Sequence, residues 1–157
     1  MNSLMQAEHF QVAYATNDID AGLRHLGCHL NITETRTLQG PLPEGGEIHV
    51  ELAWVGGVMI ELLHAQGPGS SIYQRGVQGG DQLSLSLHHL GFLIESESEW
   101  SALKAACEDS KAQLLLERVN SEFMTSCFIE VPGISHLFEY ILPSDVGRQF
   151  FNEVPRC

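Results

Sequence analysis

The chain has 157 residues, 43% of them hydrophobic, and a formal net charge of −12 with only 8 lysines and arginines. This length and composition fit one globular domain or two small modules and exclude a disordered chain. The acidic balance without a basic cluster argues against nucleic acid or an anionic membrane surface as a partner. There is no apolar run of roughly 20 residues and no signal-peptide pattern, so we expect a soluble, cytoplasmic protein without membrane contact.

The first half is expected to form a strand, a helix and three further strands. Asn17 or Asp18 is suited to cap the helix, which should stop near Gly27, and Gly56-Gly57 fits a tight hairpin turn. Two prolines and three glycines predict a loop before the hairpin. The expected elements are strand 8–15, helix 19–26, strand 30–37, loop 39–46 and strands 47–54 and 58–64.

The second half repeats this order. Ser96 followed by Glu99 forms a capping-box pattern before a helix that should bury Trp100, Leu103 and Cys107. The other expected elements are strands 86–94, 113–119, 124–131 and 135–142 and a short terminal helix within 145–154. This duplication predicts a first module over 1–64, a connector over 65–85, a second module over 86–143 and a tail over 144–157.

Two pairs of polar residues occupy similar places in the two halves. His9 and His89 lead strands whose bulky residues alternate in the same way, at an offset of 80 residues. Glu61 and Glu139 each interrupt an otherwise apolar strand, at an offset of 78. Taken singly, each histidine is explained by packing and each glutamate by solvent exposure. The joint pattern favours one shared cause.

A divalent metal ion is that cause in our interpretation, because a buried carboxylate is costly unless it is paired or bound to a metal. We expect His9, Glu61, His89 and Glu139 to hold one ion, and this ligand set accepts Zn, Ni, Co, Mn, Fe or Mg. His88 lies on the other face of its strand, and we expect it to be structural or to contact a ligand residue without binding the ion itself. The remaining histidines have no repeat partner and should be packing or surface residues: His25, His29, His49, His64 and His136.

The duplicated strand–helix–three-strand pattern with His, Glu, His and Glu at these places resembles the vicinal oxygen chelate superfamily. That superfamily includes glyoxalase I, methylmalonyl-CoA epimerase, extradiol dioxygenases and bleomycin-resistance proteins. The resemblance covers about residues 8–142 and implies an α+β fold with two tandem βαβββ modules forming a curved mixed sheet. It also implies a homodimer that acts on a small-molecule substrate.

Within the superfamily, the first half looks most like methylmalonyl-CoA epimerase. The loop Pro41–Gly46 resembles the epimerase loop whose glutamate is a base, and Met59–His64 resembles its ligand-bearing strand. Gly79-Gly80 followed by His88-His89 is similar to its Gly-Gly-x-His-His segment. The resemblance implies a metal-dependent isomerase or epimerase in which Glu44, with Glu139 as a second carboxylate, moves a proton α to a carbonyl.

The second half departs from the epimerase pattern. Lys104 and Lys111 are the only lysines, which leaves few partners for the phosphates of CoA, and the residues sharing parity with the ligands are apolar. We therefore expect a small, apolar carbonyl or hydroxy-acid substrate. A glyoxalase I-type lyase, in which a ligand glutamate moves the proton, remains an alternative, as does a protein that only sequesters a small molecule. An iron dioxygenase fits less well, because two histidines and one carboxylate would leave one glutamate unexplained.

Overall fold

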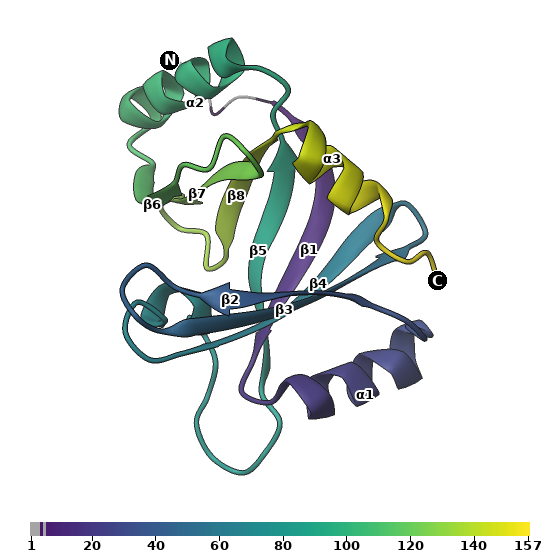
Figure 1. The fold of residues 1–157 in the computed structure, drawn as a ribbon. Helices are drawn as coiled ribbons and strands as arrows, with labels where there is room; N and C mark the ends of the chain where they lie inside the picture. The colour runs from purple at the N-terminus through teal and green to yellow at the C-terminus, as the bar shows by residue number, and fades with distance from the viewer. Residues whose placement is uncertain (1–3, 5) are drawn as a thin grey trace. The chain divides into compact units, whose positions relative to one another are not determined.

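The computed structural model describes residue 4 and residues 6–157 (Figure 1). The described residues form eight strands, three α-helices and one short 3₁₀ helix. In chain order these are β1 (Glu8–Thr16), α1 (Ile19–Leu30), β2 (Arg36–Pro41), β3 (Glu47–Val55), β4 (Val58–Gln66), η1 (Ser71–Gln74), β5 (Leu85–Leu93), α2 (Glu97–Ser110), β6 (Gln113–Arg118), β7 (Met124–Glu130), β8 (Leu137–Pro143) and α3 (Asp145–Asn152).

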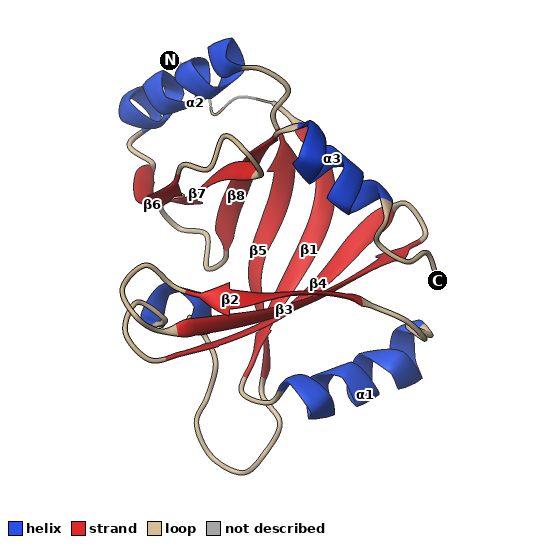
Figure 2. Ribbon diagram, viewed as in Figure 1, coloured by secondary structure: helices blue, strands red, loops and turns tan. Residues whose placement is uncertain are grey.

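The eight strands belong to one mixed sheet with the order β2-β3-β4-β1-β5-β8-β7-β6 (Figure 2). β1 pairs in parallel with β4, and β5 pairs in parallel with β8, whereas the hairpins β3–β4 and β7–β8 are antiparallel. Each half of the chain therefore has the order strand, helix and three strands. The α+β class and the two tandem βαβββ modules predicted from the sequence are confirmed.

The helices begin where their capping residues predict. The Asp18 carboxylate accepts a hydrogen bond of 2.9 Å from the Ala21 backbone at the start of α1, and the Ser96 hydroxyl accepts one of 3.2 Å from the Glu99 backbone at α2. α1 continues past Gly27, where we expected it to stop, and ends at Asn31, which adopts the left-handed conformation with φ 56°. No helix of the described residues is long and apolar enough to cross a membrane.

The second strand differs from the prediction. β2 starts at Arg36 rather than at residue 30 and runs through Pro41, so it takes the first part of the predicted loop. Proline is tolerated there because β2 is an edge strand of the sheet. The remaining loop is a tight turn, in which the Leu42 backbone N–H donates to the Gly46 carbonyl at 2.7 Å. Main-chain pairing with β3, which sequence alternation does not reveal, decided this boundary.

The chain divides into two compact units, and the division falls inside β1, after Phe10, and inside β5, after His88. The 89–152 unit also contains the described part of residues 1–10, and the 11–88 unit also contains residues 153–157. In the 89–152 unit, α2 packs on the strands through a buried cluster of Ile94, Trp100, Leu103, Cys107, Cys127, Ile129 and Tyr140. In the 11–88 unit, α1 lies so close to β4 that a Cβ on Gly22 would be 2.8 Å from Leu62.

Candidate metal centre

His89 and Glu139 form a buried ion pair between neighbouring parallel strands. Glu139 on β8 lies opposite Gly91 on β5, and His89 shares the face of Gly91 because it is two residues away. Gly91 has no side chain to fill the space between them. The His89 Nε2 atom therefore reaches Glu139 Oε2 at 2.7 Å, with the histidine side chain 1% exposed and the glutamate side chain 13% exposed.

The environment of Glu139 opposes a free negative charge. Burial raises the pKa of its carboxyl to about 8. The His89 ring also packs against Phe128, with ring centroids 5.2 Å apart, so its surroundings are partly aromatic. A cation bound beside the pair would stabilise the ionised carboxylate, which is the chemistry expected of a metal ligand.

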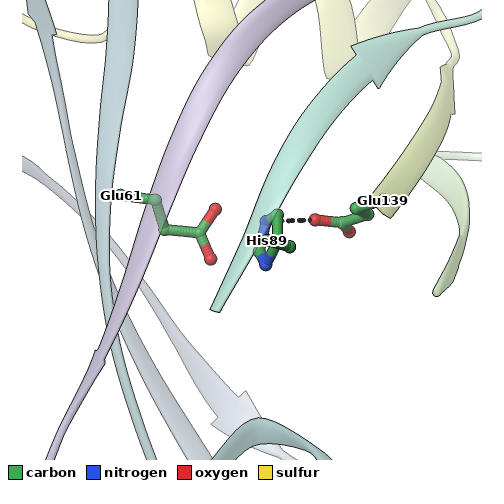
Figure 3. Close-up of side chains that lie close together, drawn as sticks. All are labelled: Glu61, His89 and Glu139. Atoms are coloured by element: carbon green, nitrogen blue, oxygen red, sulfur yellow. Dashed lines mark ion pairs between the residues drawn. The ribbon is translucent and has the colours of Figure 1, made fainter. Parts of the chain in front are cut away.

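Glu61 completes a possible metal-binding group with these two residues. Among the described residues, Glu61, His89 and Glu139 each offer one ligand atom, and the three ligand atoms lie within 4.8 Å of one another. Figure 3 draws these side chains and the ion pair between His89 and Glu139. One imidazole nitrogen and two carboxylate oxygens suit a divalent ion and leave coordination positions for other ligands.

His9, the fourth residue that the sequence indicated, is not part of this group. Its side chain is exposed, and its ring lies 5.2 Å from the ring of Phe92. Phe92 is three residues after His89 on β5 and so belongs to the opposite face of that strand. The structure thus places the ring of His9 beside an aromatic side chain.

The strand registers single out Gln11 in place of His9. Glu61 lies opposite Ala13 on β1, just as Glu139 lies opposite Gly91 on β5. The residue two positions before Ala13 is Gln11, and the residue two positions before Gly91 is His89. Gln11 is 1% exposed, and its Nε2 atom donates to the Met59 sulfur at 3.7 Å. The sequence analysis related His89 to His9 by an offset of 80 residues and so passed over Gln11. The offset of 78 residues between Glu61 and Glu139, counted back from His89, leads to Gln11.

The side chains that share a face with the two glutamates are apolar. Cross-strand partners in an antiparallel pair point to the same face of a sheet, so Leu52 shares the face of Glu61, to which it lies opposite. Residues two positions away along each strand share it as well. The buried apolar residues placed in this way are Val50, Leu52, Met59 and Leu63 beside Glu61, and Leu137 and Ile141 beside Glu139.

Glu44 lies in the exposed turn between β2 and β3. The turn is closed by the Leu42–Gly46 hydrogen bond and is tied to the segment after β4, where the Gly46 N–H donates to the Pro68 carbonyl at 2.9 Å. The Glu44 side chain occupies space that a side chain on Gly69 would need, since a Cβ there would be 2.5 Å from Glu44 Oε2. Gly69 has φ +85°, so both its conformation and this contact favour glycine.

His88 has the structural position that its parity suggested. It is 1% exposed, and its Nε2–H donates to the Ile72 carbonyl in η1 at 2.7 Å. This hydrogen bond attaches the short helix of the connector to β5 and satisfies a backbone acceptor. His88 therefore fixes the connector, whereas its neighbour His89 faces Glu139.

No protein-family model and no curated protein matches the chain. Solved structures do match it. Methylmalonyl-CoA epimerase from Mycobacterium tuberculosis gives a TM-score of 0.59 at 16% identity and covers 92% of each chain. A hypothetical protein from Bacillus halodurans C-125 gives 0.56 at 17% identity, over 90% of this chain and 97% of that one. Methylmalonyl-CoA epimerase in complex with methylmalonyl-CoA and NH4+ gives 0.54 at 15% identity, over 90% and 98%. The chain therefore has the vicinal oxygen chelate fold, the fold of these epimerases.

Proposed function

We propose that the protein is a divalent-metal-dependent isomerase or epimerase that transfers a proton at a carbon α to a carbonyl. The observation that carries this proposal is the group of Glu61, His89 and Glu139, whose ligand atoms lie within 4.8 Å of one another. The protein's resemblance in fold to epimerases, one of them in complex with methylmalonyl-CoA, supports the same reaction class. A fold alone hosts many activities, so the residues of the site carry the argument.

In this proposal Glu61, His89 and Glu139 hold the ion, and Gln11 rather than His9 supplies the fourth ligand through its amide oxygen. A set of one imidazole, two carboxylates and one amide oxygen is rich in oxygen and favours a hard ion such as Mn²⁺ or Mg²⁺. When bound, such an ion would polarise a substrate carbonyl and make its α-proton more acidic. Buried apolar neighbours of both glutamates would exclude water and strengthen that effect.

Proton transfer is assigned to Glu44, with Glu139 as the second carboxylate. Glu44 is suited to this role because its turn is fixed by backbone hydrogen bonds and its side chain lies in the space that the absence of a side chain on Gly69 leaves. A positioned carboxylate of this kind contributes about 10²–10⁴-fold as a general base. We propose a small, apolar carbonyl compound as the substrate. Arg36 lies in one cross-strand row with Leu52 and Glu61. Its positive charge is already paired with Glu153 at 2.7 Å, so it does not favour an anionic substrate. We further propose a homodimer.

Solvent-deuterium exchange tests the proposal. The protein, stripped of metal and then loaded with Mn²⁺, Mg²⁺, Co²⁺, Ni²⁺ or Zn²⁺, is incubated in D₂O with a panel of carbonyl compounds that includes CoA thioesters and neutral 2-oxo and 2-hydroxy compounds. We expect deuterium at the α-carbon of at least one compound, only with metal present, and exchange slowed about 10²-fold or more with the Glu44→Gln variant. A protein that binds a stoichiometric ion but exchanges no proton in any compound contradicts the proposal.

A glyoxalase I-type lyase is the second candidate. It is favoured by the presence of two glutamates in one group with His89, because a ligand carboxylate could then move the proton itself. In that case the Glu44→Gln variant would keep its activity, whereas Glu139→Gln would lose it. A purely sequestering protein has no need for costly buried carboxylates, and it would bind its ligand equally well without metal.

A further inference from the structure

Two histidines lie side by side on the exposed face of α1, away from the metal-binding group described above. His25 and His29 are four residues apart, so they are neighbours on the helix surface. Their ring centroids are 4.5 Å apart, with an interplanar angle of 52°, and both side chains are exposed. Neither residue has a counterpart in the second module, so the repeat does not explain the pair.

The helix that carries the pair is fixed in position. Asp18 caps its start, Asn31 in the left-handed conformation ends it, and Gly22 and Leu26 are its buried residues. The close approach of Gly22 to Leu62 leaves α1 little freedom to slide along β4. The two imidazoles are therefore presented by a rigid element, which lowers the entropy lost when both bind one ligand.

We propose that His25 and His29 form a second metal site, which binds a borderline transition-metal ion such as Ni²⁺, Cu²⁺ or Zn²⁺. Two histidines at positions i and i+4 on one helix face can coordinate the same ion. Imidazole nitrogens follow the Irving–Williams order and bind Mg²⁺ or Mn²⁺ poorly, so the site differs in metal preference from the oxygen-rich group of Glu61, His89 and Glu139.

The location on the helix also favours a cation. His29 lies in the last turn of α1, where the partial negative charge of the helix dipole stabilises positive charge. The chain carries a net charge of −12, which attracts cations over longer distances at low ionic strength. Water molecules fill the remaining coordination positions, so we expect an exchangeable site rather than a permanently occupied one.

Calorimetric titration of the full, untagged chain with Ni²⁺ tests the proposal. Ni²⁺ is the probe because, unlike Cu²⁺, it does not oxidise the exposed free thiols of Cys28 and Cys157. The variants are His25→Ala, His29→Ala and the double variant, with His136→Ala as a control that removes a histidine elsewhere. Melting temperatures and helix content confirm that each variant is folded.

We expect the wild-type protein and the control to bind Ni²⁺ at α1, each single variant to bind it at least about tenfold more weakly there, and the double variant to lose that site. In NMR spectra, paramagnetic Ni²⁺ should broaden the ring signals of His25 and His29 together. A double variant whose Ni²⁺ stoichiometry and affinity equal those of the wild type overturns the proposal.

The outcome can be separated from the test of the proposed function. Glu139→Gln should remove the other ion and leave binding at α1 unchanged, and the histidine variants should keep Mn²⁺ binding at the oxygen-rich group. If Glu139→Gln changes nothing while the double variant loses a Ni²⁺ ion, the α1 site is supported and the proposed function fails. The reverse result contradicts only the α1 site.

Discussion

The Nε2 atom of His89 lies 2.7 Å from Oε2 of Glu139, and both side chains are almost removed from solvent. An ion pair in such a place gains little net stability, because the cost of removing both groups from water offsets their attraction. A metal ion bound to both residues, as we propose, would offset that cost.

Replacement of Glu139 by glutamine should remove the metal and not the fold. Glutamine keeps the size of the side chain and abolishes its charge, and burial already disfavours that charge in the absence of a cation. We expect metal content by elemental analysis to fall from about one ion to near zero per chain, with a melting temperature of the metal-free variant equal to or above that of the metal-free wild type. Unchanged metal content would contradict Glu139 as a ligand.

Gln11 and His9 offer a paired test of the ligand set. The registers assign Gln11 to the position equivalent to His89, whereas His9 packs against Phe92. We expect Gln11→Ala to weaken Mn²⁺ binding at least about tenfold, as measured by calorimetry, and His9→Ala to leave it unchanged. The opposite ranking would restore the ligand set predicted from the sequence.

Gly69 should control the position of Glu44. In Gly69→Ala, the new methyl group would collide with the Glu44 side chain, in addition to the strain of φ +85°. Gly133→Ala is the matched control, because Gly133 has φ +84° and open space around a new Cβ. Both variants should lose about 1 kcal/mol of unfolding free energy, and only Gly69→Ala should slow proton exchange.

A double variant sharpens this comparison. In the Glu44→Gln background, Gly69→Ala should cause no further loss of exchange rate, because the base it displaces is already absent. Full additivity of the two rate losses would show that Gly69 acts on something other than Glu44.

Glu51 should make the 11–88 unit sensitive to acid. Burial opposes its ionisation, but hydrogen bonds from Thr35, His49 and Thr37 and the charge of His49 outweigh burial and keep the pKa of Glu51 below its usual range. The distances from the glutamate oxygens are 2.6 Å to Thr35, 2.6 Å to His49 and 2.9 Å to Thr37. Through Thr35 and Thr37, these contacts hold β2 and the segment just before it against β3.

The direction of the pH effect follows from this lowered pKa. The unfolded chain takes up the proton first as the pH falls, so the stabilisation by Glu51 is complete above its ordinary pKa and is lost as the pH falls through the lower folded value. We expect Thr37→Val to reduce the unfolding free energy at pH 7 by about 1 kcal/mol, and Glu51→Gln to flatten the decline of stability below about pH 4.5. Urea titrations at pH 7 and at pH 3.5 measure both effects, and equal pH slopes in wild type and Glu51→Gln would contradict the assignment.

Sequence patterns alone determined the strand–helix–three-strand repeat, because side-chain alternation, the caps at Asp18 and Ser96 and the turn glycines act over a few neighbouring residues. They also singled out Glu61, His89 and Glu139, since charged or polar residues inside apolar strands are conspicuous. Only the tertiary structure shows that Gln11, and not His9, has the register position equivalent to His89. Strand pairing joins residues 48 positions apart, Gln11 with Met59, and a shift of two residues keeps the same face of the strand. The start of β2 was decided in the same way, by main-chain pairing with β3 that no local pattern contains.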